Sequence, residues 1–250
     1  MISKYVKEST RKRIPQIFLF NLTQNSGLSI KRQVSGVNKM TKDSKAKLLY
    51  SAFGEFAKNG FLGATTRDIA EKANINISSI LYYFGGKRGM YAAALQNIVD
   101  TVKNMSADVL SRYQIVIDGG KPDEARAFLK ELVQRFLLLL CGENISKDMK
   151  TVFLSEYSKP TEDFNILYDG LIAPVHKMMA SLLSQASEGK INTKDGYLYT
   201  FPLFAQMFVF ASRKESICSF MEWNDYGEQE KQKLLKYMIN QIDFQIDSNK

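Results

Sequence analysis

Apolar residues recur at three- and four-residue steps from Ser44 almost to the end of the chain, and this spacing constrains the fold more than any other feature. The clearest stretch is 162–188, in which one helical face is apolar over several turns. That face comprises Phe164, Leu167, Tyr168, Leu171, Ile172, Val175, Met178, Met179, Leu182 and Leu183. No stretch shows a competing two-residue alternation. The sequence therefore predicts an all-α protein.

Composition is that of a globular protein in a reducing compartment. Of 250 residues, 45% are hydrophobic and 24% charged, which supports a packed core without covalent crosslinks. Two cysteines, Cys141 and Cys218, are too few for a disulfide framework. The longest apolar runs are shorter than the roughly 20 residues that cross a bilayer, and Pro15 interrupts the basic N-terminal stretch. We expect a cytoplasmic protein with no signal peptide and no membrane partner.

The net charge of +8 is concentrated near the N-terminus. Residues 1–39 hold eight Lys/Arg against Glu8, residues 40–88 hold eight against four acidic residues, and residues 89–250 hold eighteen against twenty-one. Residues 1–39 also lack helical or strand periodicity, so we expect a disordered basic tail. Alternatively, translation begins at Met40. Total basicity is thus a poor indication of DNA binding.

Four helices are predicted between Ser44 and Met105. The first runs from Ser44 to a stop at Asn59-Gly60, and the second begins at a capping box, in which Thr65 bonds the amide of Asp68 and Asp68 reaches back. The second ends at Ala73, before a turn in which Asn74 adopts the left-handed conformation. Asn76 caps a third helix over 77–83, and a long fourth helix starts at Lys87 after Gly85-Gly86.

A larger helical region follows Gly120, where Pro122 favours a helix start. The predicted helices cover roughly residues 123–141, 147–157, 162–188, 194–213 and 228–246.

The short helices around Ala73-Asn74-Ile75-Asn76 have the proportions of a helix-turn-helix, whose second helix enters the major groove of DNA. Three motifs, 65–70 (TTRDIA), 73–76 (ANIN) and 82–87 (YYFGGK), resemble the TetR/AcrR family of bacterial regulators over about residues 44–95. The resemblance implies a DNA-binding domain over residues 40–95 and a helical ligand-binding and dimerisation domain over residues 96–250.

The resemblance also implies roles for individual residues. Thr66 matches a position that contacts phosphate, and Arg67 matches one that reaches a base edge in some members. Positions that face the groove are occupied by Ile77, Ser78, Ser79 and Tyr82, and the pair that holds the DNA backbone is matched by Tyr83 and Lys87. The complete implied DNA-binding set is Thr66, Arg67, Asn76, Ile77, Ser78, Ser79, Tyr82, Tyr83 and Lys87. Hydroxyl and lysine groups suit phosphate, whereas Arg67 suits guanine.

Two residues depart from the family pattern. Leu81 stands where many relatives carry Tyr or Thr, so we expect it to pack inward, and Asn74 replaces the usual Gly. A plain helical bundle explains Phe53, Phe56, Ile69, Ile80, Leu81 and a buried Phe84. It does not explain the adjacent Tyr82 and Tyr83, because one of them must point away from a one-sided core.

The second half of the chain resembles the C-terminal domain of CecR-like members of the same family. The matching residues are Glu156-Tyr157, Pro160, Phe164, Leu167-Tyr168, Ile172, Pro174 and His176. This resemblance implies effector sensing and dimer formation.

The helices of this half carry more large apolar side chains than the packing of two layers needs. This excess indicates an apolar pocket with a few polar groups. Any single one of these side chains can still be an ordinary core residue. The predicted pocket set is Phe136, Phe153, Glu156, Tyr157, Tyr168, Ile172, His176, Met179, Phe204 and Met207. No cofactor is expected. A metal site is not expected either, because His176 is the only histidine. Gly85-Gly86-Lys87 fails the phosphate-loop pattern, since Arg88 replaces Ser/Thr.

Helix 194–213 is apolar around much of its circumference, which predicts a homodimer formed with the last helix. The interface set is Leu198, Phe201, Leu203, Phe204, Met207, Phe208 and Phe210, with Leu234, Leu235, Met238, Ile239, Ile242 and Ile246. Such a four-helix interface would hold two DNA-reading heads about 34 to 36 Å apart.

We therefore expect a repressor that binds a palindromic double-stranded operator as a dimer and is released by a small-molecule effector. One alternative is an all-α enzyme or small-molecule carrier with Glu156 and His176 as acid and base. Another is a DNA-binding regulator controlled only by protein partners.

Overall fold

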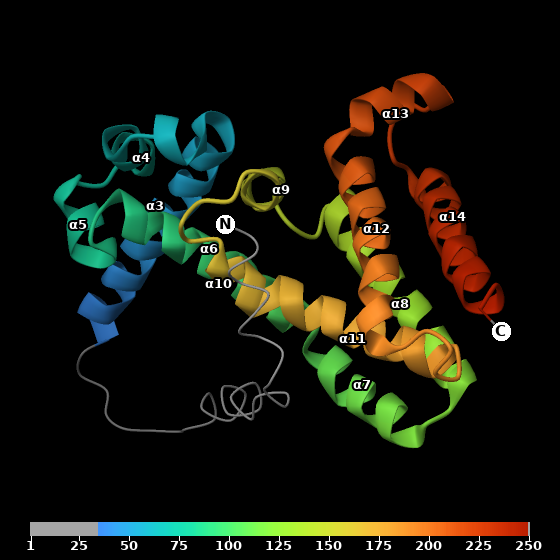
Figure 1. Ribbon diagram of the computed structural model, residues 1–250. Helices are drawn as coiled ribbons and strands as arrows, with labels where there is room; N and C mark the ends of the chain where they lie inside the picture. The colour runs from blue at the N-terminus through green and yellow to red at the C-terminus, as the bar shows by residue number, and fades with distance from the viewer. Residues whose placement is uncertain (1–34, 250) are drawn as a thin grey trace. The chain divides into compact units, whose positions relative to one another are not determined.

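Helices make up the regular structure of residues 35–249, the part of the chain described by this computed structural model, and no strand occurs among these residues (Figure 1). The all-α prediction is confirmed. The predicted tail falls mainly on residues 1–34, outside the described part, and its last residues belong to the first helix. The elements are α3 (Ser35–Gly63), α4 (Thr66–Ala73), α5 (Ser78–Phe84), α6 (Lys87–Met105), α7 (Ala107–Gly119), α8 (Pro122–Cys141), α9 (Lys147–Ser158), α10 (Asn165–Leu167), the π-helical turn η2 (Tyr168–Ile172), α11 (Ala173–Ala186), α12 (Thr193–Ser212), α13 (Lys214–Met221) and α14 (Glu228–Asp247).

Local sequence signals set most of the helix boundaries. Gly60 has φ 67° and ψ 176°, so α3 is interrupted at the predicted Asn59-Gly60 stop. Pro122 occupies the first turn of α8, where its missing amide costs no hydrogen bond. The Asn192 side chain accepts a 3.0 Å bond from the Asp195 amide and caps α12.

Three features of the helices differ from the sequence prediction. α3 begins at Ser35 rather than Ser44. α7 and α13 were not predicted as separate helices; α7 follows a break at Ser106, and α13 follows a break at Arg213. The predicted helix over 162–188 contains a π-helical turn, η2, but its apolar face still points inward along its whole length.

One hydrophobic cluster forms the core of the N-terminal helices and extends into the larger region. It joins α3, α4, α5 and α6, and it includes Ile98, Val99 and Val102 of α6. Residues far along the chain complete it, namely Ile145, Val152, Leu167, Leu171 and Ile172. The N-terminal head is therefore packed directly against α9, α10 and η2.

A second cluster forms the core of the larger region from α7, α8, α11, α12 and α14. α11 packs against both α8 and α12, and α14 packs against α8 (Figure 1). Ion pairs add to the α8–α14 contact, where Arg126 binds Asp243 and Asp247 and Lys130 binds Asp243.

This packing corrects the predicted dimer interface. The sequence prediction placed the apolar residues of the last helix and of helix 194–213 at an interface with a second copy of the chain. Most of those on α14 and four of those on α12 are instead buried in the chain's own core, because α8 and α11 cover these faces. The buried residues are Leu203, Phe204, Met207, Phe208, Leu234, Leu235, Met238, Ile242 and Ile246. Leu198 and Phe201 are exposed.

No helix within residues 35–249 combines the length and the apolar character that a bilayer crossing requires.

Candidate DNA-reading surface and ligand cavity

The turn between α4 and α5 has the geometry of a helix-turn-helix. The Asp68 amide donates to Thr65 Oγ1 at 3.1 Å, as the capping box predicts. The return bond differs from that prediction, because the Thr65 hydroxyl donates to the Asp68 carboxylate at 2.7 Å. Asn74 is left-handed, with φ 53° and ψ 47°, as predicted. Its amide and that of Ile75 bond carbonyls of α4, so the chain turns sharply into α5.

Asn76 organises the start of α5. Its Oδ1 accepts from the Ser78 amide at 2.9 Å and from the Ser78 hydroxyl at 2.8 Å. The predicted capping role is confirmed. Asn76 and Ser78 are both exposed, and the Ser78 hydroxyl, whose proton is donated to Asn76, can still accept a hydrogen bond from a donor on DNA.

Helix α5 presents one face to the core and another to solvent. Ile80 is 1% exposed, whereas Tyr82 is 80% and Ile77 50% exposed. Ser79 is half-buried. One tyrosine of the adjacent pair thus points away from the core, as expected.

Leu81 does not pack inward, and that prediction is wrong. It is 69% exposed, because Ile80, Tyr83 and Phe84 fill the inward stripe of α5 at helical spacing. Phe84, predicted to be buried, is half-buried, and Lys45 lies over its ring with Nζ 5.6 Å from the centroid.

Other residues assigned to DNA binding surround α5. Thr66 is half-buried at the first turn of α4, and Arg67 is exposed beside it. Tyr83 is half-buried against the head core and touches the Tyr82 ring at 4.9 Å between centroids. Lys87 donates from Nζ to the Leu62 carbonyl at 3.0 Å and lies over the Phe61 ring at 5.0 Å. The structure therefore brings the predicted set to α4, α5 and the start of α6.

Two polar contacts join the start of α6 to the larger region. Tyr91 Oη donates to Glu156 at 2.7 Å, and the other Glu156 oxygen accepts from the Thr161 amide and hydroxyl, each at 2.8 Å. Burial, followed by the bond to Glu156, raises the pKa of Tyr91 well above its usual range. One turn earlier, Arg88 pairs with Glu162 and Asp163.

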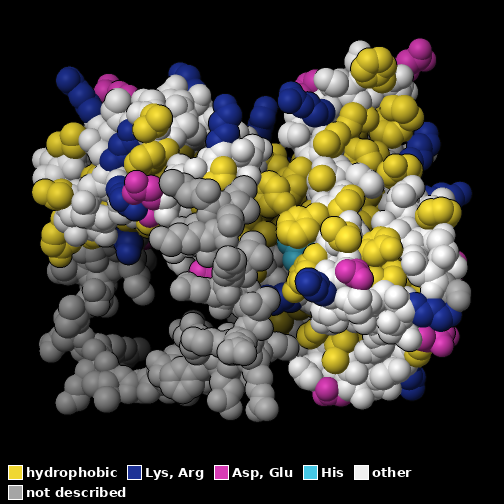
Figure 2. Space-filling view, in the orientation of Figure 1, with side chains coloured by type: hydrophobic (Ala, Val, Ile, Leu, Met, Phe, Trp, Pro, Cys, Tyr) yellow, Lys and Arg dark blue, Asp and Glu magenta, His cyan; other side chains and the backbone are white. Residues whose placement is uncertain are grey.

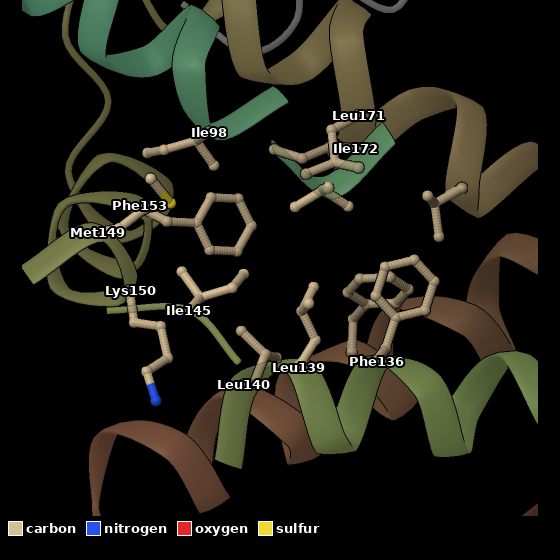
Figure 3. A pocket seen from close by; sticks show the side chains of 13 residues that line it. Ile98, Phe136, Leu139, Leu140, Ile145, Met149, Lys150, Phe153, Leu171 and Ile172 are labelled. Carbon is tan, nitrogen blue, oxygen red and sulfur yellow. The ribbon is translucent and has the colours of Figure 1, made fainter. Parts of the chain in front are cut away.

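A cavity lies where the head core meets the core of the larger region (Figure 3). Its volume is about 30 Å³, which is room for water but not for a larger molecule unless the walls move. Its walls come from α6, α8, the segment before α9, α9, η2, α11 and α12. The lining residues are Ile98, Val102, Phe136, Leu139, Leu140, Ile145, Met149, Lys150, Phe153, Leu171, Ile172, Val175 and Phe204.

The predicted pocket residues divide between this cavity and the core. Phe136, Phe153, Ile172 and Phe204 line the cavity, and the remaining six do not. Met179 and Met207 are fully buried in the core of the larger region, because α8, α11 and α12 pack directly on them. Tyr157 stacks on Phe208 with centroids 4.4 Å apart, and Tyr168 packs beside Phe164.

Glu156 and His176, the two polar residues of the predicted pocket, make hydrogen bonds away from the cavity. Glu156 is 1% exposed and held by Tyr91 and Thr161 as described. His176 is 2% exposed, and its Nδ1 lies 2.9 Å from Thr200 Oγ1. Burial lowers the pKa of His176 to about 4. The two side chains share no partner among these contacts, so nothing here assembles them as an acid–base pair.

The sequence prediction missed the α6 wall of the cavity, Ile98 and Val102, and two of its three α9 residues, Met149 and Lys150. The apolar members carry the same helical spacing as ordinary core residues, so pattern alone does not separate them. Lys150 is not set apart by the pattern either, because Lys147 and Asp148, charged residues of the same helix, are exposed.

No group of three or more His, Cys, Asp or Glu side chains suited to a metal ion occurs among residues with described side chains.

Comparison with known proteins matches both halves of the chain. A family model described as "Bacterial regulatory proteins, tetR family" matches residues 48–94, and one described as "HTH-type transcriptional dual regulator CecR, C-terminal domain" matches residues 125–248. The HTH-type transcriptional dual regulator CecR of Shigella flexneri is 26% identical over 201 residues, covering 79% of this chain and 88% of CecR. The HTH-type transcriptional regulator RutR of Escherichia coli O157:H7 is 27% identical over 120 residues, covering 43% and 56%.

Solved structures share the fold at lower identity. AibR, in complex with isovaleryl coenzyme A and operator DNA, aligns with a TM-score of 0.58 at 16% identity, covering 79% of this chain and 96% of AibR. A putative fatty acid metabolism regulator of Clostridium perfringens aligns at 0.55 and 19% identity, covering 79% and 97%. With a helix-turn-helix head, a helical second region and a family model matching each, the chain belongs to the TetR family of bacterial transcriptional regulators and carries a CecR-type C-terminal domain.

Proposed function

We propose that the chain is a repressor that binds a palindromic operator as a homodimer in the cytoplasm and is released by a small-molecule effector. The exposed face of α5 is the observation that carries the proposal. Tyr82 and Ser78 of this short helix and Ile77 just before it are exposed, and the helix is anchored by Ile80 and positioned by the Asn74 turn. A protruding helix with a polar and aromatic face fits a major groove.

The flanking residues suit contacts to phosphate. Tyr83 lies on α5, Thr66 at the start of α4 and Lys87 at the start of α6. Hydroxyl and ammonium groups of this kind set the register of a protein on DNA without reading its sequence. Arg67 is exposed and makes no ion pair within the described residues, so its guanidinium is available to a base edge. The head would thus combine groups that bind phosphate and fix its position on DNA with groups that contact bases and recognise the sequence.

An exposed apolar surface supports the homodimer. On α12, Leu198, Phe201, Ala205 and Val209 follow one face and are exposed. Further exposed apolar residues lie on the two following helices, namely Phe220, Met221, Tyr237 and Phe244. Figure 2 shows hydrophobic side chains gathered over this part of the molecule. Contiguous apolar surface of this kind favours an interface, here with a second copy of the chain.

The route from effector to operator would run through α6. This helix starts at Lys87 beside α5, and its later residues Ile98 and Val102 line the cavity. A ligand that widens the cavity would therefore displace a helix of the head. It can shift the DNA-binding state only if it binds one arrangement of α6 more tightly than the other. AibR, with its acyl coenzyme A and operator, supports such a linkage by analogy of fold.

Operator binding can be tested with DNA from upstream of the chain's own gene. Nuclease protection should reveal one palindromic site, and mobility shift should give saturable binding to it. Tyr83→Ala with Lys87→Ala should weaken binding at least tenfold through lost phosphate contacts, whereas Tyr50→Ala, exposed elsewhere in the head, should not. Binding of equal strength by the double variant would refute the role of this surface.

The dimer can be tested by sedimentation. Phe201→Glu should shift the chain toward monomer and weaken operator binding in parallel, because a charge is placed on the apolar face of α12. Ile115→Glu is a matched control, since Ile115 is similarly exposed on α7. A monomeric wild-type chain, or a Phe201→Glu chain that remains dimeric, would count against this interface.

A further inference from the structure

The exposed face of α5 has an apolar side. Leu81 is 69% exposed, and Ile77, which directly precedes the helix with helical backbone angles (φ −56°, ψ −31°), is 50% exposed. Residues four apart on a helix lie on the same side, so these two side chains are neighbours. By the same spacing, Ser78 lies at the middle of the exposed face and Tyr82 on its other side. Figure 2 shows hydrophobic side chains at the edge of the head where α5 lies in Figure 1.

The side chains of α5 lack the groups that make two hydrogen bonds to one base. The helix has the sequence SSILYYF, which contains no arginine, lysine, asparagine or glutamine. Arginine bound to guanine, and asparagine or glutamine bound to adenine, are the pairings that read a base most specifically. Arg67 and Lys87, the cations of the implied DNA-binding set, belong to α4 and α6. Serine and tyrosine hydroxyls both donate and accept, so they distinguish bases weakly. The apolar side is therefore the part of α5 best suited to select a base.

Thymine is the base that offers an apolar group in the major groove. Its 5-methyl group projects into the groove, where the other bases present polar atoms or hydrogen. A branched aliphatic side chain that contacts this methyl group removes apolar surface of both partners from water, which favours binding. Leu81 still has 69% of its surface in water, so most of that surface is available for such a contact.

Leu81 is also held in place before any DNA binds. Its carbonyl accepts a 2.9 Å bond from the amide of Gly85, whose left-handed conformation (φ 72°) ends the helix. The adjacent Ile80 is 1% exposed, and Tyr83 and Phe84 pack against the core of the head. The backbone that carries Leu81 is thus fixed from both sides, and little conformational freedom remains to be lost on binding.

We propose that Leu81, with Ile77 beside it, contacts the 5-methyl group of a thymine in each operator half-site and is a specificity-determining residue of α5. The proposal deepens the operator-binding function set out above and rests on it. It names the class of DNA that the head selects, which is a half-site with thymine at the base pair that faces the apolar side of α5. Tyr82 and Arg67 would contact other positions.

Two other roles for Leu81 make different predictions. An exposed leucine without any partner is common on protein surfaces, and its removal would change neither operator affinity nor base preference. A leucine that packs against deoxyribose would add affinity without reading the base, so its removal would weaken binding to all fragments alike. Contact with the methyl group makes the effect of Leu81 depend on the presence of that methyl group.

Replacing thymine by 2′-deoxyuridine tests the contact, because uracil lacks the 5-methyl group and keeps the pairing with adenine. A series of fragments carries the site identified by nuclease protection, each with this replacement at one thymine. The full chain is titrated with each fragment by fluorescence anisotropy at a single salt concentration. For wild type we expect at least one thymine in each half-site at which uracil weakens binding about three- to tenfold, as the loss of one methyl contact allows.

Leu81→Ala should weaken binding to the thymine fragment and bring the effect of uracil at that position below about twofold, because the side chain that senses the methyl group is gone. Leu62→Ala is the matched control, since Leu62 is 89% exposed in the head but lies outside α5, and it should keep the full effect. If the unfolding curve of Leu81→Ala departs from that of wild type, Leu81→Gln takes its place with the same expectation.

Three results would overturn the inference while leaving operator binding intact. They are protected half-sites that contain no thymine, an effect of uracil below about threefold at every thymine for wild type, and an effect that stays above about twofold at every sensitive thymine in Leu81→Ala. Absence of specific binding by wild type to any upstream fragment would instead overturn the operator function on which the inference rests.

Discussion

Tyr91 of α6 donates a 2.7 Å hydrogen bond to Glu156 of α9, and both side chains are buried. The first residue belongs to the helix that begins in the DNA-reading head, and the second to the larger region. The contact fixes one end of α6 against α9, while Ile98 and Val102, two and three turns later, line the cavity. The same helix, α6, therefore belongs to the head at its start and forms a wall of the cavity further along.

Tyr91→Phe should lower the free energy of unfolding by about 1 to 3 kcal/mol, because Glu156 then loses one donor in a buried site. Chemical denaturation measures this change. Tyr50→Phe is the control and should stay within about 0.5 kcal/mol, since Tyr50 is 78% exposed. A stability unchanged by Tyr91→Phe would show that the hydroxyl is not needed.

Gly170→Ala should destabilise the contact between η2 and α6. A Cβ at this position would lie 2.8 Å from Val99 Cγ1 and 2.9 Å from its Cγ2, both on a packed helix. We expect a loss of about 1 to 3 kcal/mol in the free energy of unfolding. Adding Val99→Ala should cost less in the Gly170→Ala background than in wild type. Strict additivity of the two changes would rule out this clash.

His176 should make stability fall in mild acid. Its pKa is lowered by burial to about 4, below the value of about 6.5 expected in the unfolded chain. Its contribution is therefore complete above pH 6.5 and is lost as pH falls through 4. Between pH 7 and pH 4, wild type should lose up to about 3 kcal/mol more than His176→Gln. Parallel pH profiles of the two proteins would contradict the assignment.

Ile80→Ala and Leu81→Ala test which way α5 faces. Ile80 is 1% exposed and Leu81 69%, although the residues are adjacent. Ile80→Ala should cost about 2 to 4 kcal/mol in the free energy of unfolding, and Leu81→Ala about 0.5 kcal/mol or less. A larger cost for Leu81→Ala would mean that α5 is rotated in solution.

Much of the head could be predicted from sequence because its signals are local. The Thr65 cap, the left-handed Asn74 and the Asn76 cap each depend on one side chain bonding backbone within three residues. Leu81 was misplaced because its burial depends on which neighbours fill the inward stripe of α5, and Tyr83 and Phe84 fill it.

The larger region was harder to predict because its decisive contacts are distant in sequence. The apolar stripe of α14 was assigned to a second subunit, but α8 covers it within the same chain. Helical spacing identifies a buried face without identifying what buries it. The cavity presents the same difficulty, since Ile98 of α6 and Ile172 of η2 meet there from separate elements.

The central claim, that the exposed face of α5 reads an operator, is tested most directly by fluorescence anisotropy. The full chain is titrated against the upstream fragment that nuclease protection identifies and against a scrambled fragment of the same length. Both titrations use the same salt concentration. We expect the protected fragment to bind at least about a thousandfold more tightly, and Tyr82→Ala with Arg67→Ala to reduce that ratio by about tenfold or more. Equal affinity for the two fragments, or a ratio that the double variant leaves unchanged, would contradict the claim.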